Sequence, residues 1–474
     1  MLFHSLEFAF FFIAIVTLYF TVAHRYRWVL LLVGSYFFYM CWNWKYSALI
    51  IISTVVDYYA GRRMAVLPDK RSRRKYLMLS LFTNLGLLFT FKYFNFFAES
   101  LNQTLLFIDF STHIPHLNVL LPVGISFYTF QTLSYSIDVY RGKVEHEQHF
   151  GIFALYVSFF PQLVAGPIER AGRLLPQLHT KNFFDEARFV SGLRLMLWGL
   201  FKKIAIANRL AIYVDAVYGN ADLHNGVTLL FATYLFAFQI YCDFSGYSDI
   251  AIGAARVLGY DLMRNFRRPY FAKTINEFWH RWHISLSTWF RDYLYIPLGG
   301  NRKGLTKMLL NMIIVFIVSG MWHGANWTFL IWGVLHGVFA VMSKVTLPWR
   351  DRFVAGKLPR ALVVFFRMFV TFHLVCLAWI FFRADSITEA NFIIQQIVTF
   401  PGRDLFIPEF DKFSYGIFVV VFLLFVESAQ EWLHLSEKFI RRPRAIRWLS
   451  YVAIFVVLVL IGVFDESQFI YFQF

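Results

Sequence analysis

Charged residues are scarce in this chain of 474 residues. Asp, Glu, Lys and Arg make up 16% of it, whereas soluble proteins carry ~25%. Hydrophobic residues account for 58%, and the mean hydropathy is +0.53. Too few charged side chains remain to cover the surface of a soluble protein of this length. The shortage excludes an ordinary cytosolic enzyme and a disordered chain, and it predicts a polytopic membrane protein.

Cysteine is also rare. Cys41, Cys242 and Cys376 lie far apart and form no C-x-x-C pair, which excludes a disulfide scaffold and a zinc ribbon. No basic region or small-residue cleavage site precedes His24, so the first apolar segment is expected to be a retained span. The chain has no internal repeat and no Ser/Gly-rich linker, and we therefore expect one membrane domain over 1–474.

Long hydrophobic runs, by contrast, are abundant. A membrane span needs ~20 mostly apolar residues, and the candidates are 8–23, 28–43, 46–60, 76–98, 119–137, 306–322, 325–343, 361–383, 413–427 and 448–464. Four more segments are apolar but too polar to face lipid: 151–167, 190–214, 227–256 and 275–297. Irregular backbone at membrane depth must be buried in protein or line a wet cavity. We expect an all-α bundle of about 10–12 transmembrane helices with embedded or re-entrant helices around a cavity.

Positive charges exceed negative charges, with 45 Lys and Arg against 29 Asp and Glu and a net charge of +16. Nucleic-acid-binding proteins also show such an excess. Here the basic residues form short bursts between apolar segments, which is typical of cytoplasmic loops. The partner is therefore expected to be a lipid bilayer and not a nucleic acid. Segments 24–27, 61–75, 138–150, 298–305, 344–360 and 431–447 are predicted inside, and 44–46, 99–118, 384–412 and the tail 465–474 outside.

The densest polar stretch within an apolar context runs from Asn276 to Asn301. On one continuous helix, five of its residues would form a single polar stripe: Asn276, His280, His283, Ser287 and Arg291. Such a stripe must face a wet or protein-lined cavity, unless the helix lies on the membrane surface. A metal site at His280 and His283 would lack an obvious third ligand, and no metal is predicted.

A histidine also stands at the end of the apolar run 306–322. His323 is flanked by Gly320 and Gly324, and a further histidine, His336, follows. Histidine within a span is rare and indicates function, although a helix-packing role is the alternative. Asp243 and Asp249 likewise interrupt an apolar segment, and their expected partners are Arg264, Arg267 and Arg268 or the polar stripe. Pro167 predicts a helix break just before Glu169 and Arg170.

These residues lie in stretches that resemble the membrane-bound O-acyltransferase (MBOAT) family, in particular its bacterial branch that acetylates alginate and peptidoglycan. The matching stretches are 121–142, 160–170, 241–253, 278–301 and 321–333. The resemblance implies a helical bundle around a central tunnel, where a cytoplasmic acyl donor meets an acceptor hydroxyl from the other side. N-terminal spans would occupy 1–137, the tunnel-forming core 138–345, and C-terminal spans 346–464.

The resemblance also implies roles for individual residues. His323 matches the near-invariant histidine of the family, and His283 matches its partner position. Acetyl-CoA would be the donor substrate, with no permanently bound cofactor. No Gly-rich phosphate loop is present, so the phosphates of coenzyme A would contact scattered Arg and Lys side chains. Candidates for lining the tunnel are Asn276, His280, Ser287, Arg291, Trp322 and Asp243.

The tail ends in Phe469-Ile-Tyr-Phe-Gln-Phe474. This Phe-x-Tyr-x-x-Phe pattern resembles the C-terminal motif of the small protein that accompanies the teichoic-acid D-alanylation system. Tyr471 would then carry the acyl group as a phenyl ester, which stays activated because phenolate is a good leaving group. The alternative is an aromatic residue anchored at the membrane interface.

The expected function is O-acetyl transfer from cytoplasmic acetyl-CoA toward hydroxyls of an extracytoplasmic polysaccharide, with peptidoglycan favoured over alginate or cellulose. A separate periplasmic or cell-surface O-acetyltransferase would finish the reaction. The enzyme is placed in the bacterial cytoplasmic (inner) membrane with its C-terminus outside. A D-alanyl transferase supplied by a carrier protein is one alternative. A transporter or flippase is another, but the symmetry of broken helices typical of transporters is missing.

Overall fold

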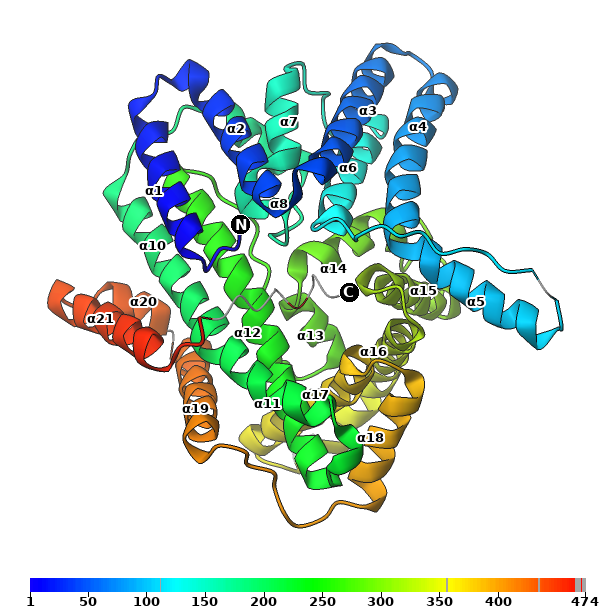
Figure 1. Ribbon diagram of the computed structural model, residues 1–474, viewed down its shortest axis with the longest axis vertical. Coiled ribbons are helices and arrows are strands. Elements are labelled where there is room, and N and C mark those ends of the chain that lie inside the picture. Colours follow the sequence, from blue (N-terminus) through cyan, green and yellow to red (C-terminus); the bar gives the residue numbers. More distant parts are fainter. Residues whose placement is uncertain (111, 355–356, 434, 465–469, 471–474) are drawn as a thin grey trace. The chain divides into compact units, whose positions relative to one another are not determined.

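The computed structural model of the chain describes residues 1–110, 112–354, 357–433, 435–464 and 470 (Figure 1). Within these ranges every regular element is a helix, which confirms the all-α class. The chain divides into two compact units. Unit 1 comprises Met1–Met196 and Ala251–Met263, and unit 2 comprises Leu197–Ile250 and Arg264–Phe474.

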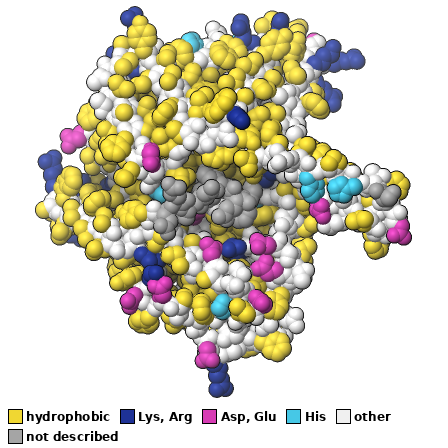
Figure 2. All heavy atoms as spheres, viewed as in Figure 1, with side chains coloured by type: hydrophobic (Ala, Val, Ile, Leu, Met, Phe, Trp, Pro, Cys, Tyr) yellow, Lys and Arg dark blue, Asp and Glu magenta, His cyan; other side chains and the backbone are white. Residues whose placement is uncertain are grey.

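Helices long and apolar enough to cross a membrane number seven in the described part of the chain. Large hydrophobic side chains cover much of the face shown in Figure 2. Many large hydrophobic side chains of the described residues are exposed, and Phe82 and Leu460 are 80% and 75% exposed. Water would make such a surface prone to aggregation, whereas lipid buries it. The protein is therefore a multi-pass membrane protein.

Unit 1 holds the N-terminal helices. These are α1 (Leu6–Thr21), α2 (His24–Asn43), η1 (Trp44–Tyr46), α3 (Ser47–Val66), α4 (Lys70–Leu88), η2 (Phe89–Tyr93), α5 (Phe94–Phe107), α6 (Ile125–Tyr140), α7 (Phe150–Ser158), α8 (Phe160–Leu163), α9 (Ala171–His179) and the start of α10 (Glu186–Leu200). The predicted span 119–137 begins six residues too early. Gly124 has a φ of 78° and precedes the first helical residue, while Pro122 has no N–H to donate. The break predicted at Pro167 is confirmed, because residues 164–170 between α8 and α9 are not helical.

A buried carboxylate joins three helices of unit 1. Asp57 of α3 is 0% exposed and accepts hydrogen bonds from Ser80 and Asn84 of α4 and from Ser136 of α6. The Asn84 Nδ2–Asp57 Oδ2 distance is 2.9 Å. A buried polar group is costly unless it is bonded, so this cluster specifies how α3, α4 and α6 pack.

Unit 2 holds the remaining helices. These are η3 (Phe201–Ala207), α11 (Asn208–Tyr218), η4 (Ala221–Leu223), most of α12 (Gly226–Leu258), η5 (Pro269–Phe271), α13 (Ile275–Arg281), α14 (Ile284–Phe290), η6 (Arg291–Tyr295), α15 (Leu305–His323), α16 (Trp327–Val354), α17 (Arg360–Arg383), α18 (Ile387–Thr399), α19 (Phe410–Trp432), α20 (Leu435–Ile440) and α21 (Arg444–Ile461). The loop expected over 384–412 contains the 13-residue helix α18.

The continuous helix expected over 276–291 is wrong. It breaks between α13 and α14 at His283, whose φ of 43° lies in the left-handed region. The backbone of a neighbouring segment explains the break. Ile284 N–H donates to Asn265 O at 2.9 Å, and Arg267 N–H donates to Arg281 O at 2.8 Å. These bonds replace the i→i−4 bonds that a continuous helix would form, and the polar stripe is divided.

Helices α15 and α16 form a tight antiparallel pair. A Cβ added at Gly320 would collide with the Phe329 carbonyl, and one at Gly333 would collide with the Phe316 carbonyl. Only glycine permits backbones to approach this closely. The pair fixes the end of α15, and His323 is the last residue of that helix.

Candidate active site

Two buried histidines lie together in unit 2. His283 is 0% exposed and His323 is 2% exposed, and their ring centroids are 6.5 Å apart. The Trp322 ring contacts both, at 5.8 Å from His283 and 5.0 Å from His323. Sequence positions 40 residues apart therefore form one compact cluster, in which two bases could act on one substrate.

Asn265 fixes the orientation of His283. The Asn265 Oδ1 atom accepts hydrogen bonds from Ser285 N–H at 3.2 Å and Ser285 Oγ at 2.9 Å, which identifies it as the carbonyl oxygen. His283 Nδ1 lies 3.1 Å from the same oxygen and must therefore donate to it. This tautomer leaves the lone pair on Nε2, so Nε2 is the atom of His283 that can accept a proton.

The surroundings of His283 keep the ring neutral. Phe244 packs edge-on against it at 4.7 Å, and Phe266 lies at 6.3 Å. Burial among these apolar groups lowers the pKa of His283 to about 3. His283 lies between two short helices, outside the candidate membrane spans. A neutral imidazole is the form that acts as a general base.

An aromatic shell surrounds His323. Trp332 of α16 lies 4.8 Å away and Phe382 of α17 lies 5.6 Å away. Trp332 also contacts His336 at 4.8 Å, and Trp279 Nε1 donates to His336 Nδ1 at 3.3 Å. His336 is 0% exposed. The shell excludes water from His323, a condition that protects a reactive acyl group from hydrolysis.

Two buried lysines neutralise the aspartates of α12. Lys203 Nζ lies 2.5 Å from Asp243 Oδ1, and Lys202 Nζ lies 2.7 Å from Asp249 Oδ2. The arginine partners expected for these aspartates are wrong. Arg268 instead pairs with Glu431 at 2.6 Å. The lysines reach α12 because they lie in the π-helical turn η3, at the place where Gly199 and Gly246 let the two backbones come close.

Comparison with known proteins identifies the family. The model of the membrane-bound O-acyltransferase family matches residues 30–383. The chain belongs to the membrane-bound O-acyltransferase family. It is 37% identical over 406 residues to the probable alginate O-acetylase AlgI of Pseudomonas syringae, covering 84% of this chain and 76% of that protein. The predicted family is thus confirmed, and the protein is an acyltransferase.

Two other relatives are named for different acceptors. The peptidoglycan O-acetyltransferase of Helicobacter pylori is 35% identical over 401 residues, which cover 79% of this chain and 74% of that protein. The teichoic acid D-alanyltransferase of Bacillus subtilis is 26% identical over 285 residues, covering 57% of this chain and 70% of that protein. The family resemblance therefore includes both acetyl and D-alanyl transfer.

The side chains of several residues predicted to line a tunnel in this acyltransferase have partners other than the two histidines, or are exposed. His280 is exposed, and Arg291 is exposed and pairs with Asp292 at 2.8 Å. Asn276 donates to Ala340 O at 3.3 Å and Ser287 to Trp282 O at 3.3 Å. Within the described ranges, no three His, Cys, Asp or Glu side chains converge on a metal position. Tyr471 lies outside the described residues.

Sequence reasoning missed Asn265 and the two lysines. Lys202 and Lys203 carried a usable signal, because two adjacent lysines within the apolar segment 190–214 require buried partners. Asn265 gave none, since it lies among arginines in a segment without periodicity. Only the folded backbone brings it to His283.

Proposed function

We propose that this acyltransferase moves acetyl groups from cytoplasmic acetyl-CoA, across the bacterial inner membrane, toward hydroxyls of an extracytoplasmic polysaccharide. Peptidoglycan is the favoured acceptor, and alginate or cellulose are the alternatives. Tyr471 carries the group as an ester, and a separate periplasmic or cell-surface transferase completes the reaction. The observation that carries the proposal is the buried pair His283 and His323, in which the tautomer of His283 is fixed.

The chemistry needs only a base and exclusion of water. The Tyr471 phenol oxygen attacks the thioester carbon, and the C–O bond forms while the C–S bond breaks. The phenol proton passes to His323 and then to the leaving thiolate, so coenzyme A departs as the thiol. In a second step an acceptor hydroxyl attacks the ester, and its proton returns to the phenolate.

The last described residue of the tail supports a role for Tyr471. Ile470 is 5% exposed, and its N–H donates to Asp243 Oδ2 at 2.8 Å. Asp243 directly precedes Phe244, the ring that packs on His283. Tyr471 follows Ile470 in the sequence. Burial of Ile470 beside Asp243 is what a covalent carrier at the next position of the sequence requires.

Intact mass spectrometry after incubation with acetyl-CoA tests the proposal. Wild-type protein should gain one acetyl group that maps to Tyr471. Tyr471→Phe and His323→Ala should remove the modification, whereas His280→Ala, an exposed histidine on α13, should retain it. If the wild type transfers acetyl without carrying it, the covalent step is wrong and direct transfer remains. Indifference to acetyl-CoA, with loading by a D-alanyl carrier protein, would establish the D-alanyl alternative.

A further inference from the structure

Unit 1 contains a small cavity lined by arginine and histidine side chains. Its volume is about 170 Å³, smaller than the ~300–1,000 Å³ of sites for drug-sized ligands. Six of the side chains that line it are His24, Arg25, Arg27, Trp28, His149 and His179. No carboxylate is among its described lining residues. A space of this size with such a lining suits a compact anion.

Three parts of unit 1 form most of the cavity: the start of α2, the segment before α7 and the end of α9. The charge pattern places the first two on the cytoplasmic side. The start of α2 supplies His24, Arg25, Arg27 and Trp28, and the end of α9 supplies His179. His149 is the residue before α7. The Trp28 and His149 rings meet at 4.8 Å. A Cβ at Gly151 would collide with the Trp28 ring, so glycine is required for this contact. The walls are therefore fixed by packing and not only by surface loops.

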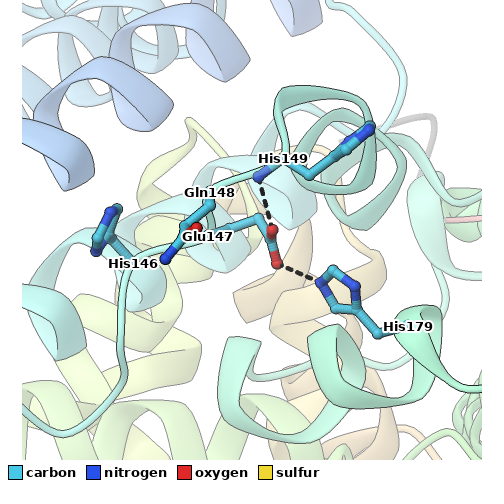
Figure 3. Close-up of a pocket in the computed structure, with 5 residues that line it drawn as sticks. All are labelled: His146, Glu147, Gln148, His149 and His179. Atoms are coloured by element: carbon cyan, nitrogen blue, oxygen red, sulfur yellow. Dashed lines mark hydrogen bonds and ion pairs between the residues drawn. The ribbon is translucent and has the colours of Figure 1, made fainter.

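Glu147 is the carboxylate that bonds two of the lining residues, and it is already occupied by them. Figure 3 shows Glu147 between the His149 backbone and His179. It accepts the His149 N–H at 2.8 Å and lies 2.7 Å from His179 Nε2. Neither Arg25 nor Arg27 forms an ion pair with a carboxylate of the described residues. Their positive charge is thus not neutralised by a carboxylate of the described residues.

Two histidines of the lining also have ring nitrogens that can hydrogen-bond a ligand. His149 Nδ1 accepts the Ile152 N–H at 3.1 Å, so its neutral ring carries the proton on Nε2 and can donate from there. His24 Nδ1 is buried and has no hydrogen-bond partner within the described ranges. Arg27 is held by Asn182 O at 2.5 Å and Val22 O at 3.2 Å, which fixes its guanidinium at the wall.

We propose that this cavity binds a phosphate group. Arginine and histidine donors around a site without carboxylates match a phosphate oxyanion better than a neutral ligand. The phosphate could come from an anionic phospholipid headgroup or from coenzyme A. Binding of coenzyme A rests on the proposed function, whereas binding of a phospholipid headgroup does not.

Reconstitution of the full chain in nanodiscs separates the two sources. In discs of phosphatidylcholine alone, the affinity for coenzyme A is measured by calorimetry. In discs with an equal mixture of phosphatidylcholine and phosphatidylglycerol, the retained lipid is identified by native mass spectrometry. Arg25→Gln and His24→Gln should each weaken either the affinity for coenzyme A or the retention of phosphatidylglycerol by about tenfold. The reason is that each substitution removes a donor to the phosphate. Arg25→Lys should retain most of the binding.

Arg74→Gln is the matched control, since Arg74 is an exposed arginine at the start of α4 and outside the cavity. Loss of coenzyme A affinity assigns the site to the donor, and loss of retained phosphatidylglycerol assigns it to lipid. The proposal is overturned if folded, monodisperse Arg25→Gln and His24→Gln proteins match the control in both assays. Acetyl transfer by the wild type is measured separately. Its absence would contradict only the proposed function and not the phosphate site.

Discussion

A single buried amide decides which nitrogen of His283 carries the proton. Asn265 Oδ1 collects three hydrogen bonds, from Ser285 N, Ser285 Oγ and His283 Nδ1. Its own Nδ2 donates to Ser248 Oγ at 3.2 Å, so the amide cannot flip without losing these partners. Asn265 is thus a positioning residue that acts through His283.

We therefore predict that Asn265→Ala lowers kcat for acetyl transfer by at least about tenfold and leaves KM for the donor nearly unchanged, because the ring loses its fixed tautomer. Steady-state kinetics of purified protein measure this split. Asn265→Asp keeps an acceptor oxygen and should recover part of the rate. Asn220→Ala, in an exposed turn, is the control. An equal rise in KM and fall in kcat would indicate general damage to the site instead.

At the scale of the helix, His323 depends on the closeness of α15 and α16. The pair Gly320 and Gly333 lets the two backbones touch, and any side chain there would push the helices apart. Because His323 ends α15 and Trp332 lies on α16, separation would also open the aromatic shell. The identity of these glycines thus matters to packing and to the site.

Gly333→Ala is expected to destabilise the protein by about 1–3 kcal/mol through overpacking and to reduce acetyl transfer. Gly86→Ala is a matched control, since Gly86 also lies within a helix but a Cβ there meets nothing within 4 Å. It should be neutral or stabilising by up to ~1 kcal/mol. Thermal denaturation, with size-exclusion chromatography as the readout of folded protein, compares the stability of the two variants. Equal stability of the two variants would contradict the close contact.

At the scale of the molecule, the distribution of basic turns sets orientation in the membrane. Within unit 1, the α1–α2 and α3–α4 turns lie at the same end, at the top of Figure 1, and the α2–α3 turn lies at the other end of these helices. The contact between Trp28 and His149 brings the α6–α7 connection to the first group. This arrangement agrees with the sides predicted from charge.

Cysteine labelling in intact cells should follow these sides. With Cys41→Ser as background, Arg25→Cys and Arg74→Cys should resist a membrane-impermeant maleimide until the cells are opened. Lys45→Cys and His113→Cys should react at once, because positive charge holds the other turns in the cytoplasm. Labelling of all four in intact cells, or of none, would contradict the predicted topology.

The sequence alone determined the class, most of the spans and the family. Hydropathy over ~20 residues depends only on local composition, and the span predicted over 361–383 falls within α17 (Arg360–Arg383). The motif around His323 is equally local. Four predicted spans, 8–23, 28–43, 46–60 and 119–137, are not among the seven described helices that are long and apolar enough to cross a membrane. At 119–137 the start of α6 is set by turn chemistry at Pro122 and Gly124, which outweighs an apolar run.

Only the tertiary structure decided the details of the site. The break at His283 depends on backbone hydrogen bonds to the segment that carries Asn265, 18 residues earlier. Asp243 pairs with Lys203 because the π-helical turn η3 packs against α12. The residues in such contacts lie at sequence separations that follow no helical or strand period. They pair because an unpaired buried polar group costs free energy. That cost exists only once the chain is packed.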